Sequence, residues 1–277
     1  MPRIYDLHCH SDQSDGILSP EALVSRAKRQ DVDVLALTDH DTTIGLQRAR
    51  EQAEIEGLEF IHGIEFSCLW QGRGIHLVAL NIDPDHPALV ELVAEQSAVR
   101  QERAQTIADK LAALDMPDAL QGARKYAGDG VIGRPHFAAF MVEKGYCKNV
   151  RQAFKKYLGS GKVGDIKQAW PQLEAVAACV RESGAVPVLA HPSKYNMTRT
   201  KLCAMVDAFK ASGGLALEVV SGMQQQSVTQ DLAKIANEYN LFASCGSDFH
   251  APDQQWQELG KFSPMPDNVE AVWAYWE

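Results

Sequence analysis

Short hydrophobic stretches alternate with amphipathic segments along most of the chain. Seven of these stretches are four to seven residues long and rich in apolar and β-branched residues, which is typical of buried strands. Helical periodicity lies between most of them, and this alternation predicts an α/β fold with a parallel sheet, open or closed into a barrel. The predicted strands are residues 3–7, 32–37, 59–64, 75–81, 186–190, 216–220 and 241–244.

Capping residues mark several of the predicted helices. Ser19 followed by Pro20 and Glu21 is typical of a helix N-terminus. A helix that starts near Thr42 is expected to end at Gly57. Further helices are predicted over residues 171–183, 198–212, 227–239 and 269–276.

The alternation breaks between the fourth and fifth strands, where residues 87–114 predict one long helix. Shorter helices are predicted over 119–126, 135–144 and 150–158. Residues 96–167 hold 13 Lys and Arg against 7 Asp and Glu, although the whole chain has a net charge of −9. We therefore predict a basic, mostly helical insertion domain (96–167) that covers the active-site mouth of a discontinuous barrel domain (1–95 and 168–277).

Composition narrows the class of protein. Hydrophobic residues make up 45% and charged residues 23% of the chain, as in ordinary globular proteins. No apolar run approaches the ~18 residues of a membrane span, and no signal peptide is visible. The six cysteines form no C-x-x-C pair and are expected to be reduced core residues. We therefore expect a cytoplasmic protein that does not bind membranes.

Residues that bind metals gather where the predicted strands end. His8 and His10 alternate along a strand, so both imidazoles can reach one ion. In α/β barrels the carboxyl ends of the strands meet at one mouth, and buried ionisable groups are costly unless they are paired or bind metal. Nine such ligands would suit two or three divalent ions, and imidazole and carboxylate donors favour Mn²⁺, with Fe²⁺ or Zn²⁺ as alternatives. The predicted ligands are His8, His10, Asp15, His40, Glu65, His76, His191, Asp248 and His250.

This pattern resembles the PHP (polymerase and histidinol phosphatase) family of metal phosphoesterases. The resemblance implies a distorted seven-stranded (βα) barrel of the PHP type with a helical insertion. It implies three metal positions: one with His8, His10, Glu65 and Asp248, one with Glu65, His76 and His191, and one with Asp15, His40 and His250. Many members have His where this chain has Asp15. The matching motifs are His8-Cys9-His10, Ser14-Asp15-Gly16, Thr38-Asp39-His40, Glu65, His76, His191-Pro192 and Ser247-Asp248-Phe249-His250.

Within the family, the chain is most similar to nucleoside 3′,5′-bisphosphate phosphatases and 5′-to-3′ exoribonucleases. This resemblance implies hydrolysis of the 3′-phosphate of substrates such as adenosine 3′,5′-bisphosphate to the 5′-mononucleotide, and stepwise cleavage of short single-stranded RNA. The residue set predicts attack by a hydroxide that bridges metal ions. The alternatives are a histidinol-phosphate or general phosphomonoesterase and a non-catalytic metal- or nucleic-acid-binding module. The branch motifs include Tyr5-Asp6-Leu7-His8, Thr38-Asp39-His40-Asp41-Thr42 and Ile75-His76-Leu77-Val78.

Two departures from the branch pattern concern the substrate. Gly164-Asp165-Ile166 stands where Gly-Tyr-Val is common, so an aromatic residue that could stack on a base is absent there. Lys194 stands where Arg is usual after His-Pro.

The catalytic centre is expected to comprise Glu65, Asp248, His191 and His40. The insertion is expected to supply a second phosphate site, because guanidinium groups bind phosphate in bidentate geometry. Arg100 and Arg103 share a face of the long helix, as residues three apart do. A compact basic segment does not indicate duplex DNA binding, which favours a longer basic face. The predicted substrate contacts are Arg100, Arg103, Arg134, His136, Lys162 and His250.

Other polar and aromatic residues have structural interpretations beside functional ones. Asp39 and Asp41 flank His40, and either could orient an imidazole, although Asp41 also fits a helix N-cap. Trp70 and Trp170 could line the mouth. Three C-terminal tryptophans are predicted to pack the last helix against the barrel: Trp256, Trp273 and Trp276.

Overall fold

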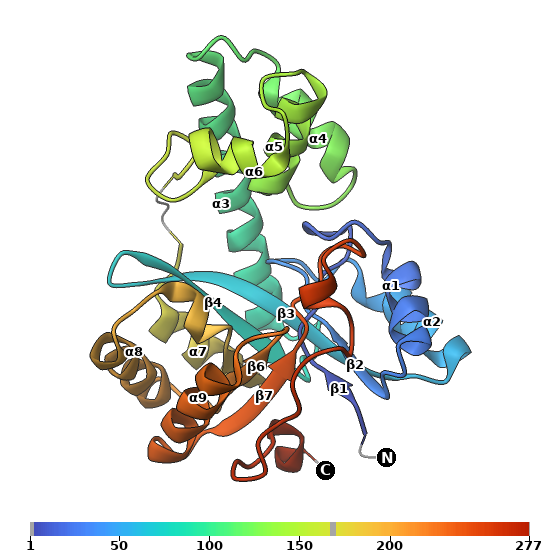
Figure 1. Cartoon of the computed structure of the whole chain (residues 1–277), viewed down its shortest axis with the longest axis vertical. Helices are drawn as coiled ribbons and strands as arrows, with labels where there is room; N and C mark the ends of the chain where they lie inside the picture. Colours follow the sequence, from blue (N-terminus) through green and yellow to red (C-terminus); the bar gives the residue numbers. More distant parts are fainter. Residues whose placement is uncertain (1–2, 167–169, 277) are drawn as a thin grey trace.

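The computed structural model describes residues 3–166 and 170–276, and its centre is a nearly closed barrel (Figure 1). Seven strands pair in sequence order. The last strand returns to the first, since the Leu7 amide donates to the Cys245 carbonyl (3.1 Å). The predicted seven-stranded α/β barrel is therefore confirmed. The strands are β1 (Tyr5–Asp6), β2 (Val34–Leu37), β3 (Glu59–Trp70), β4 (Arg73–Leu80), β5 (Val186–Leu189), β6 (Ala216–Ser221) and β7 (Phe242–Gly246).

The β3–β4 pair departs from the predicted parallel arrangement. β4 is antiparallel to both β3 and β5, whereas the other neighbours are parallel. Only Gln71 and Gly72 join β3 to β4, and both have positive φ (48° and 71°). Two residues can close a hairpin but cannot make the crossover that parallel strands need. The hairpin pairs Ser67 with His76, which brings His76 to the same side of the sheet as Glu65.

Helices α1, α2, α7, α8 and α9 surround the barrel (Figure 1). The hydroxyl of Ser19 caps α1, and Gly57 ends α2 in the left-handed region (φ 61°), as predicted. The start of α2 at Leu46 is four residues later than predicted. None of the described helices is long and apolar enough to cross a membrane. The bounds are α1 (Pro20–Arg29), α2 (Leu46–Glu56), α7 (Leu173–Glu182), α8 (Arg199–Ala211) and α9 (Gln226–Glu238), with short 3₁₀ turns η2 (Pro192–Tyr195), η3 (Gln255–Gln257) and η4 (Val272–Tyr275).

The predicted helix over residues 269–276 is wrong, because only the 3₁₀ turn η4 forms there. The chain before η4 is extended instead, and the Glu270 carbonyl accepts a hydrogen bond from the Ala243 amide of β7 (2.7 Å). Trp273 stacks on Tyr5 with ring centroids 3.9 Å apart, and Trp276 packs against the core. The prediction fails for Trp256, whose side chain is 59% exposed.

The insertion rises from the barrel on the long helix α3 (Figure 1). It has its own hydrophobic cluster, formed by residues between Ala104 and Leu158, apart from the cluster of the barrel. The domain boundaries stay predictions, and residues 167 and 168 lie outside the described residues. The elements are α3 (Pro87–Ala112), α4 (Ala119–Ala127), α5 (Arg134–Glu143), α6 (Val150–Ala153) and the π-helical turn η1 (Phe154–Leu158).

The insertion contacts the barrel through loops that carry predicted metal ligands. The Val131 amide donates to the Gln13 carbonyl (3.0 Å) in the loop after β1. On α3, Arg100 forms a buried ion pair with Asp41 (2.6 Å) in the loop after β2 and donates to the Ser67 hydroxyl (3.1 Å) in β3. The basic insertion therefore sits over the end of the barrel where β1 and β2 terminate.

Candidate metal centre

Six histidines and three carboxylates, from residue 8 to residue 250, meet at one end of the barrel. Five of them are almost fully buried (His8, His10, Glu65, His191 and Asp248). Their nitrogen and oxygen atoms form several groups in which all ligand atoms lie within 4.8 Å of one another. The structure thus brings together every predicted metal ligand: His8, His10, Asp15, His40, Glu65, His76, His191, Asp248 and His250.

Glu65 lies at the centre of the arrangement, and its two oxygens face different histidines. Oε2 is 3.3 Å from Nε2 of both His8 and His10. Oε1 is 3.0 Å from His76 Nδ1 and 2.9 Å from His191 Nε2. A carboxylate with this geometry can bridge two ions.

Asp248 completes the group around Glu65 Oε2. Its Oδ1 lies 3.6 Å from His8 Nε2 and 3.4 Å from His10 Nε2. The other oxygen, Oδ2, accepts hydrogen bonds from the Lys194 ammonium and from Gln257 Nε2. Asp248 therefore offers one oxygen to an ion, while protein donors hold the other.

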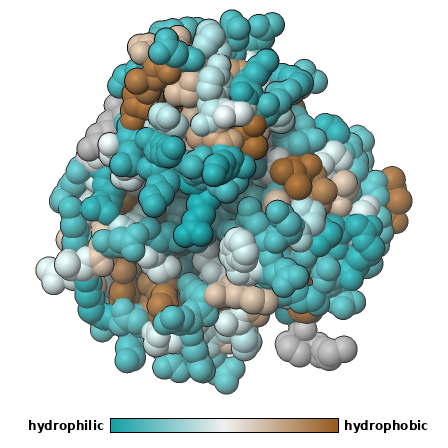
Figure 2. All heavy atoms as spheres, turned by 45° about the horizontal axis from the view of Figure 1, so that its top comes forward, coloured by the Kyte–Doolittle hydropathy of each residue, from teal (hydrophilic) through white to brown (hydrophobic). Residues whose placement is uncertain are grey.

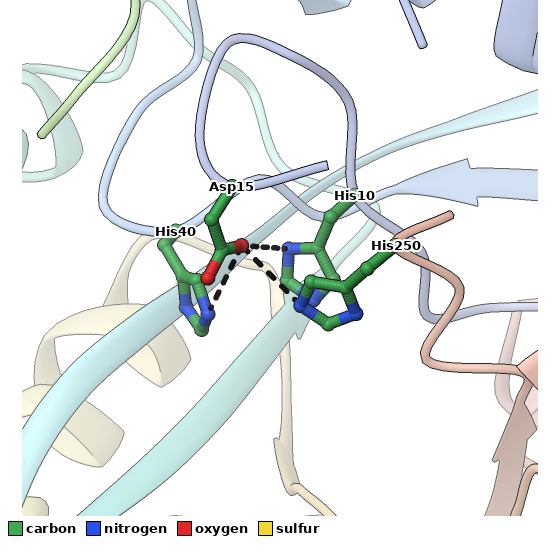
Figure 3. A group of neighbouring side chains, drawn as sticks. All are labelled: His10, Asp15, His40 and His250. Atoms are coloured by element: carbon green, nitrogen blue, oxygen red, sulfur yellow. Dashed lines mark ion pairs between the residues drawn. The ribbon is translucent and has the colours of Figure 1, made fainter. Parts of the chain in front are cut away.

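Asp15 is the centre of another group, shown in Figure 3. Its Oδ1 lies 3.3 Å from His250 Nε2, 3.7 Å from His40 Nε2 and 4.0 Å from His10 Nδ1. His40 also turns Nδ1 toward Glu65 Oε2 at 3.0 Å. This group contains the residues that the resemblance places at the third metal position, with His10 in addition.

Orphaned polar atoms show that this site fits divalent ions. Among the described residues, several buried ligand atoms have no hydrogen-bond partner: His8 Nε2, His10 Nε2, Asp15 Oδ1, His40 Nδ1 and Glu65 Oε2. Such atoms cost free energy unless something binds them. Four of these atoms lie together around Glu65 Oε2, and Asp15 Oδ1 belongs to the adjacent group. Imidazole nitrogen with carboxylate oxygen is a donor set for Mn²⁺, Fe²⁺ or Zn²⁺.

The charge states suit metal binding as well. Burial alone raises the pKa of the Glu65 carboxyl, but His8, His76 and His40 lower it well below its ordinary value. Burial also raises the pKa of the Asp15 carboxyl, but His40 and His250 outweigh this effect and lower it well below its ordinary value. Burial lowers the pKa of His40 to about 4. At neutral pH the carboxylates are ionised and His40 is neutral, which are the forms that coordinate metals. Burial lowers the pKa of His8 and His10, but the carboxylates around them outweigh it and raise both values, that of His10 to about 10. These two histidines would therefore release protons when an ion binds.

Glu218 is a part of the site that sequence reasoning missed. It lies in β6 and is buried, and both of its oxygens are 3.2 Å from His8 Nδ1. It also accepts a hydrogen bond from the His191 amide (2.5 Å). An Nδ1–H that donates to Glu218 leaves His8 Nε2 free for an ion. A lone acidic residue within the apolar strand Ala216–Ser221 was the available signal.

Two of the predicted ligands occupy unusual backbone conformations. His191 and Asp248 have φ values of 28° and 54°, at the ends of β5 and β7. Positive φ costs a non-glycine residue of order 1–3 kcal/mol and is concentrated at functional sites. The hydrogen bonds from His191 to Glu218 and from Asp248 to the His8 carbonyl (2.8 Å) hold these turns in place.

The residues that flank His40 do not orient its imidazole by direct contact. Asp39 accepts hydrogen bonds from Ser11 and from the Ser14 hydroxyl (2.6 Å), so it shapes the loop that carries Asp15. Asp41 is not a helix cap, since the N-cap of α2 is Gly45. Its carboxylate instead accepts a hydrogen bond from the Ser67 amide (2.6 Å) and pairs with Arg100.

Five of the six predicted substrate contacts lie in the insertion at varied depth, whereas His250 lies in the metal centre. Arg100 and Arg103 both approach the ring of Trp170, at 5.5 and 5.9 Å. Arg134 lies 3.7 Å from Asp165, the residue that replaces an aromatic residue of the branch pattern. His136 accepts a hydrogen bond from the Gly133 amide (2.9 Å), and Lys162 is exposed. Trp70 is almost fully buried, which contradicts its expected place at the mouth.

Comparisons with known proteins agree with this geometry. The family model for the PHP domain matches residues 6–221. A 5′-3′ exoribonuclease of Haemophilus influenzae is 44% identical over 99% of both chains. The 3′,5′-nucleoside bisphosphate phosphatase of Chromobacterium violaceum is 36% identical over 97% of this chain and 94% of its own.

Solved structures show the same fold. A protein from Chromobacterium violaceum, described as an amidohydrolase with bound sulfate and no metal, is 36% identical and superposes with a TM-score of 0.92 over 98% of this chain and 95% of its own. One from Bifidobacterium adolescentis, described as a predicted metal-dependent phosphoesterase, is 26% identical with a TM-score of 0.83 over 99% and 95% of the two chains. The chain therefore belongs to the PHP domain family, as its metal-ligand motifs predict.

Proposed function

We propose that the protein hydrolyses the 3′-phosphate of nucleoside 3′,5′-bisphosphates to give 5′-mononucleotides, and that it also removes 5′-nucleotides from short single-stranded RNA. The single observation that carries this proposal is the juxtaposition of a metal centre around Glu65 with a separate cationic cluster in the insertion. A substrate with two phosphates needs two such sites. Relatives named as 5′-3′ exoribonucleases and as a 3′,5′-nucleoside bisphosphate phosphatase support both activities.

The metal centre would hold the phosphate that is cleaved. Divalent ions would neutralise its oxygens and supply a hydroxide near neutral pH. In this chain, Glu65 would bridge two ions, Asp248 and His191 would fix the positions of those ions, and His40 would connect the Glu65 and Asp15 groups. His250 would keep Nε2 directed at the centre, because its Nδ1–H donates to the Asp248 carbonyl (2.8 Å).

Arg103 is the strongest candidate for contact with the second phosphate. Within the described part of the chain, its half-buried guanidinium has no acceptor for the Nε–H. Burial, with Arg134 and Arg100 nearby, lowers the pKa of Arg103 to about 10. Asp41 pairs with Arg100 and Asp165 lies near Arg134, which leaves Arg103 as the cation that an anion would stabilise most. His136 and Lys162 are expected to complete this site.

Mn²⁺ is the proposed metal, in two or three positions. Asp15 gives the third position an oxygen ligand where many members have imidazole, which suits a harder ion. The six cysteines are free, which fits the reducing conditions of the cytoplasm.

The decisive experiment is a turnover assay of Mn²⁺-reconstituted protein on three substrates: adenosine 3′,5′-bisphosphate, a 5′-phosphorylated RNA oligomer and histidinol phosphate. We expect turnover of the first two and little of the third, because histidinol phosphate has no second phosphate for Arg103. Asp248→Ala should lower kcat by about 10² or more, as loss of a metal ligand does. Turnover of histidinol phosphate alone would overturn the proposal in favour of that phosphomonoesterase activity.

The role of Arg103 can be separated from that of the metal centre. Arg103→Ala should raise KM for adenosine 3′,5′-bisphosphate about tenfold or more while leaving KM for adenosine 3′-monophosphate nearly unchanged, because the latter lacks the 5′-phosphate. Arg151→Ala, which removes an exposed cation of α6, is the matched control. An equal effect of Arg103→Ala on both nucleotides would contradict this assignment.

A further inference from the structure

Two large apolar side chains are exposed beside the metal centre. Trp256 in η3 is 59% exposed and Met223, just after β6, is 60% exposed. Exposed tryptophan is uncommon, because the ring loses much of its favourable burial, and it often marks a binding surface. Figure 2 shows the face that carries the insertion as mainly hydrophilic, with hydrophobic residues in separate patches.

The loop that carries Trp256 is held firmly at both ends and in its middle. Asp6, buried in β1, accepts hydrogen bonds from the Ser247 amide (2.8 Å) and the Gly260 amide (2.9 Å). Gln257 donates from Nε2 to the Asp248 carbonyl (2.6 Å) and to its carboxylate (3.0 Å). Trp256 is therefore one residue from a side chain that contacts a predicted metal ligand, and the exposure belongs to an ordered loop.

A second loop supports η3 from the side of β6. The Met223 amide donates to the Trp256 carbonyl (2.8 Å). Gly222 has φ 54°, and a Cβ at this position would lie 2.8 Å from the Trp256 carbonyl oxygen. The close approach of the two backbones thus requires glycine. It places Met223 and Trp256 on neighbouring loops after β6 and β7.

The loop of Met223, after β6, lies across the barrel mouth from the seat of Arg100 on the insertion, and the loop of Trp256, after β7, lies between them beside β1. Arg100 contacts Asp41 and Ser67, after β2 and in β3, whereas the strand order places β6 on the far side of a seven-stranded barrel from β2 and β3. Trp256 adjoins Gln257, which contacts Asp248, so the nucleotide that follows a scissile phosphate held at Glu65 and Asp248 would come within reach of the Trp256 loop. Figure 1 shows the segment after β7 at the end of the barrel that faces the insertion.

We propose that Trp256 and Met223 form a stacking platform for the nucleobase on the 3′ side of the cleaved bond in single-stranded RNA. This inference rests on the proposed function. Indole stacks on any base with little sequence preference, and the methionine thioether makes favourable contacts with aromatic rings. A nucleoside 3′,5′-bisphosphate has no nucleotide beyond its 3′-phosphate, so it cannot use the platform. The platform therefore separates RNA from the bisphosphate as substrates.

The experiment compares the wild type with Trp256→Ala on three substrates: adenosine 3′,5′-bisphosphate, a 5′-phosphorylated RNA trinucleotide, and the same trinucleotide with an abasic second position. We expect kcat/KM for the intact trinucleotide to fall about tenfold, mainly through KM, because stacking on an aromatic residue contributes that much per base. Activity on the bisphosphate should be unchanged. The wild-type preference for the intact over the abasic RNA should disappear in Trp256→Ala and largely return in Trp256→Phe.

Tyr275→Ala, which removes an exposed aromatic side chain of η4 near the C-terminus, is the matched control and should leave all three activities unchanged. Equal losses on RNA and bisphosphate would assign Trp256 a structural role and overturn the platform. An unchanged preference for the intact RNA would overturn it as well, and would leave the surface to a protein partner. If the wild type cleaves the bisphosphate but not RNA, the RNA half of the proposed function fails and the platform fails with it.

Discussion

Glu218 shows how much a single residue outside the ligand set can control. Its carboxylate contacts the His8 ring and the His191 backbone, so one buried acidic residue orients predicted ligands that follow β1 and β5. Partners of this kind fix the tautomer of a ligand and raise its basicity. Without them, a histidine nitrogen can lie at the right distance and still carry the proton that blocks coordination.

Glu218→Gln is expected to lower metal affinity about 10- to 100-fold with little change in fold. Glutamine keeps the size of the side chain but removes the charge that favours an Nδ1–H on His8. Bound Mn²⁺ per protein after equilibrium dialysis, measured by mass spectrometry, checks the outcome. Glu182→Gln at the exposed end of α7 is the control. Full metal content in Glu218→Gln at limiting Mn²⁺ would show that His8 does not depend on this carboxylate.

The clustering of the nine predicted ligands could be foreseen from sequence because most of them are His or carboxylate residues at strand ends, although Glu65 and His76 lie within β3 and β4. Glu218 could not be foreseen, since an acidic residue within an apolar strand can equally pair with a cation or a backbone amide. Trp256 was misassigned for another reason. Its neighbours along the chain suggested a packed C-terminal helix, and nothing local revealed that Asp6 and Gln257 would hold its loop at the barrel mouth.

At the scale of elements, local signals predicted the helices well and strand direction poorly. Ser19 and Gly57 mark real helix ends because they satisfy backbone groups in their own neighbourhood. The direction of β4 depends instead on the length of its connection to β3, and a Gln71-Gly72 turn within apolar surroundings was easily overlooked. Residues 270–271 are extended because β7 supplies a backbone partner, which no local pattern encodes.

The contact between the insertion and the loop after β1 is a second feature at the scale of elements. Gly130 approaches this loop so closely that a Cβ would lie 2.6 Å from the Asp12 carbonyl oxygen and 2.8 Å from that of Gln13. Both obstacles are backbone atoms, which cannot rotate away. The segment before α5 is thereby tied to the loop that presents Asp15.

Gly130→Ala is expected to displace this loop and lower kcat/KM for adenosine 3′,5′-bisphosphate about tenfold, at a cost of about 1–3 kcal/mol in the free energy of unfolding. Steady-state kinetics and urea denaturation check the two effects. Gly74→Ala is the matched control, because a Cβ there meets open space. Wild-type kinetics in Gly130→Ala would mean that the insertion can shift without disturbing Asp15.

At the scale of the whole molecule, the centre gathers nine ionisable side chains at one end of the barrel. Three of these side chains are carboxylates that share histidine neighbours, namely Glu65, Asp15 and Asp248. The whole chain also has a net charge of −9. Divalent ions would neutralise these three carboxylates and link strands from around the barrel. Bound metal should therefore stabilise the folded protein against unfolding, in addition to supporting its activity.

Mn²⁺ at about 100 times its Kd should add about 2.7 kcal/mol per site to the free energy of unfolding. For a chain of this size the gain corresponds to a rise in Tm of about 5–10 °C. Thermal melts of metal-free protein across a Mn²⁺ titration measure it, and a chelator should reverse it. Asp248→Ala should show a smaller rise. A Tm that does not depend on Mn²⁺ would contradict a metal centre built from these residues.

The span of the ligand set along the chain has a consequence for biosynthesis. His8 and His10 leave the ribosome well before Asp248 and His250, which lie much later in the chain. Because synthesis proceeds from the N-terminus, an incomplete chain carries His8, His10 and Glu65 long before Asp248 exists. The centre can be completed only when β7 has paired with β1, so the uptake of metal is a late step that reports a finished barrel.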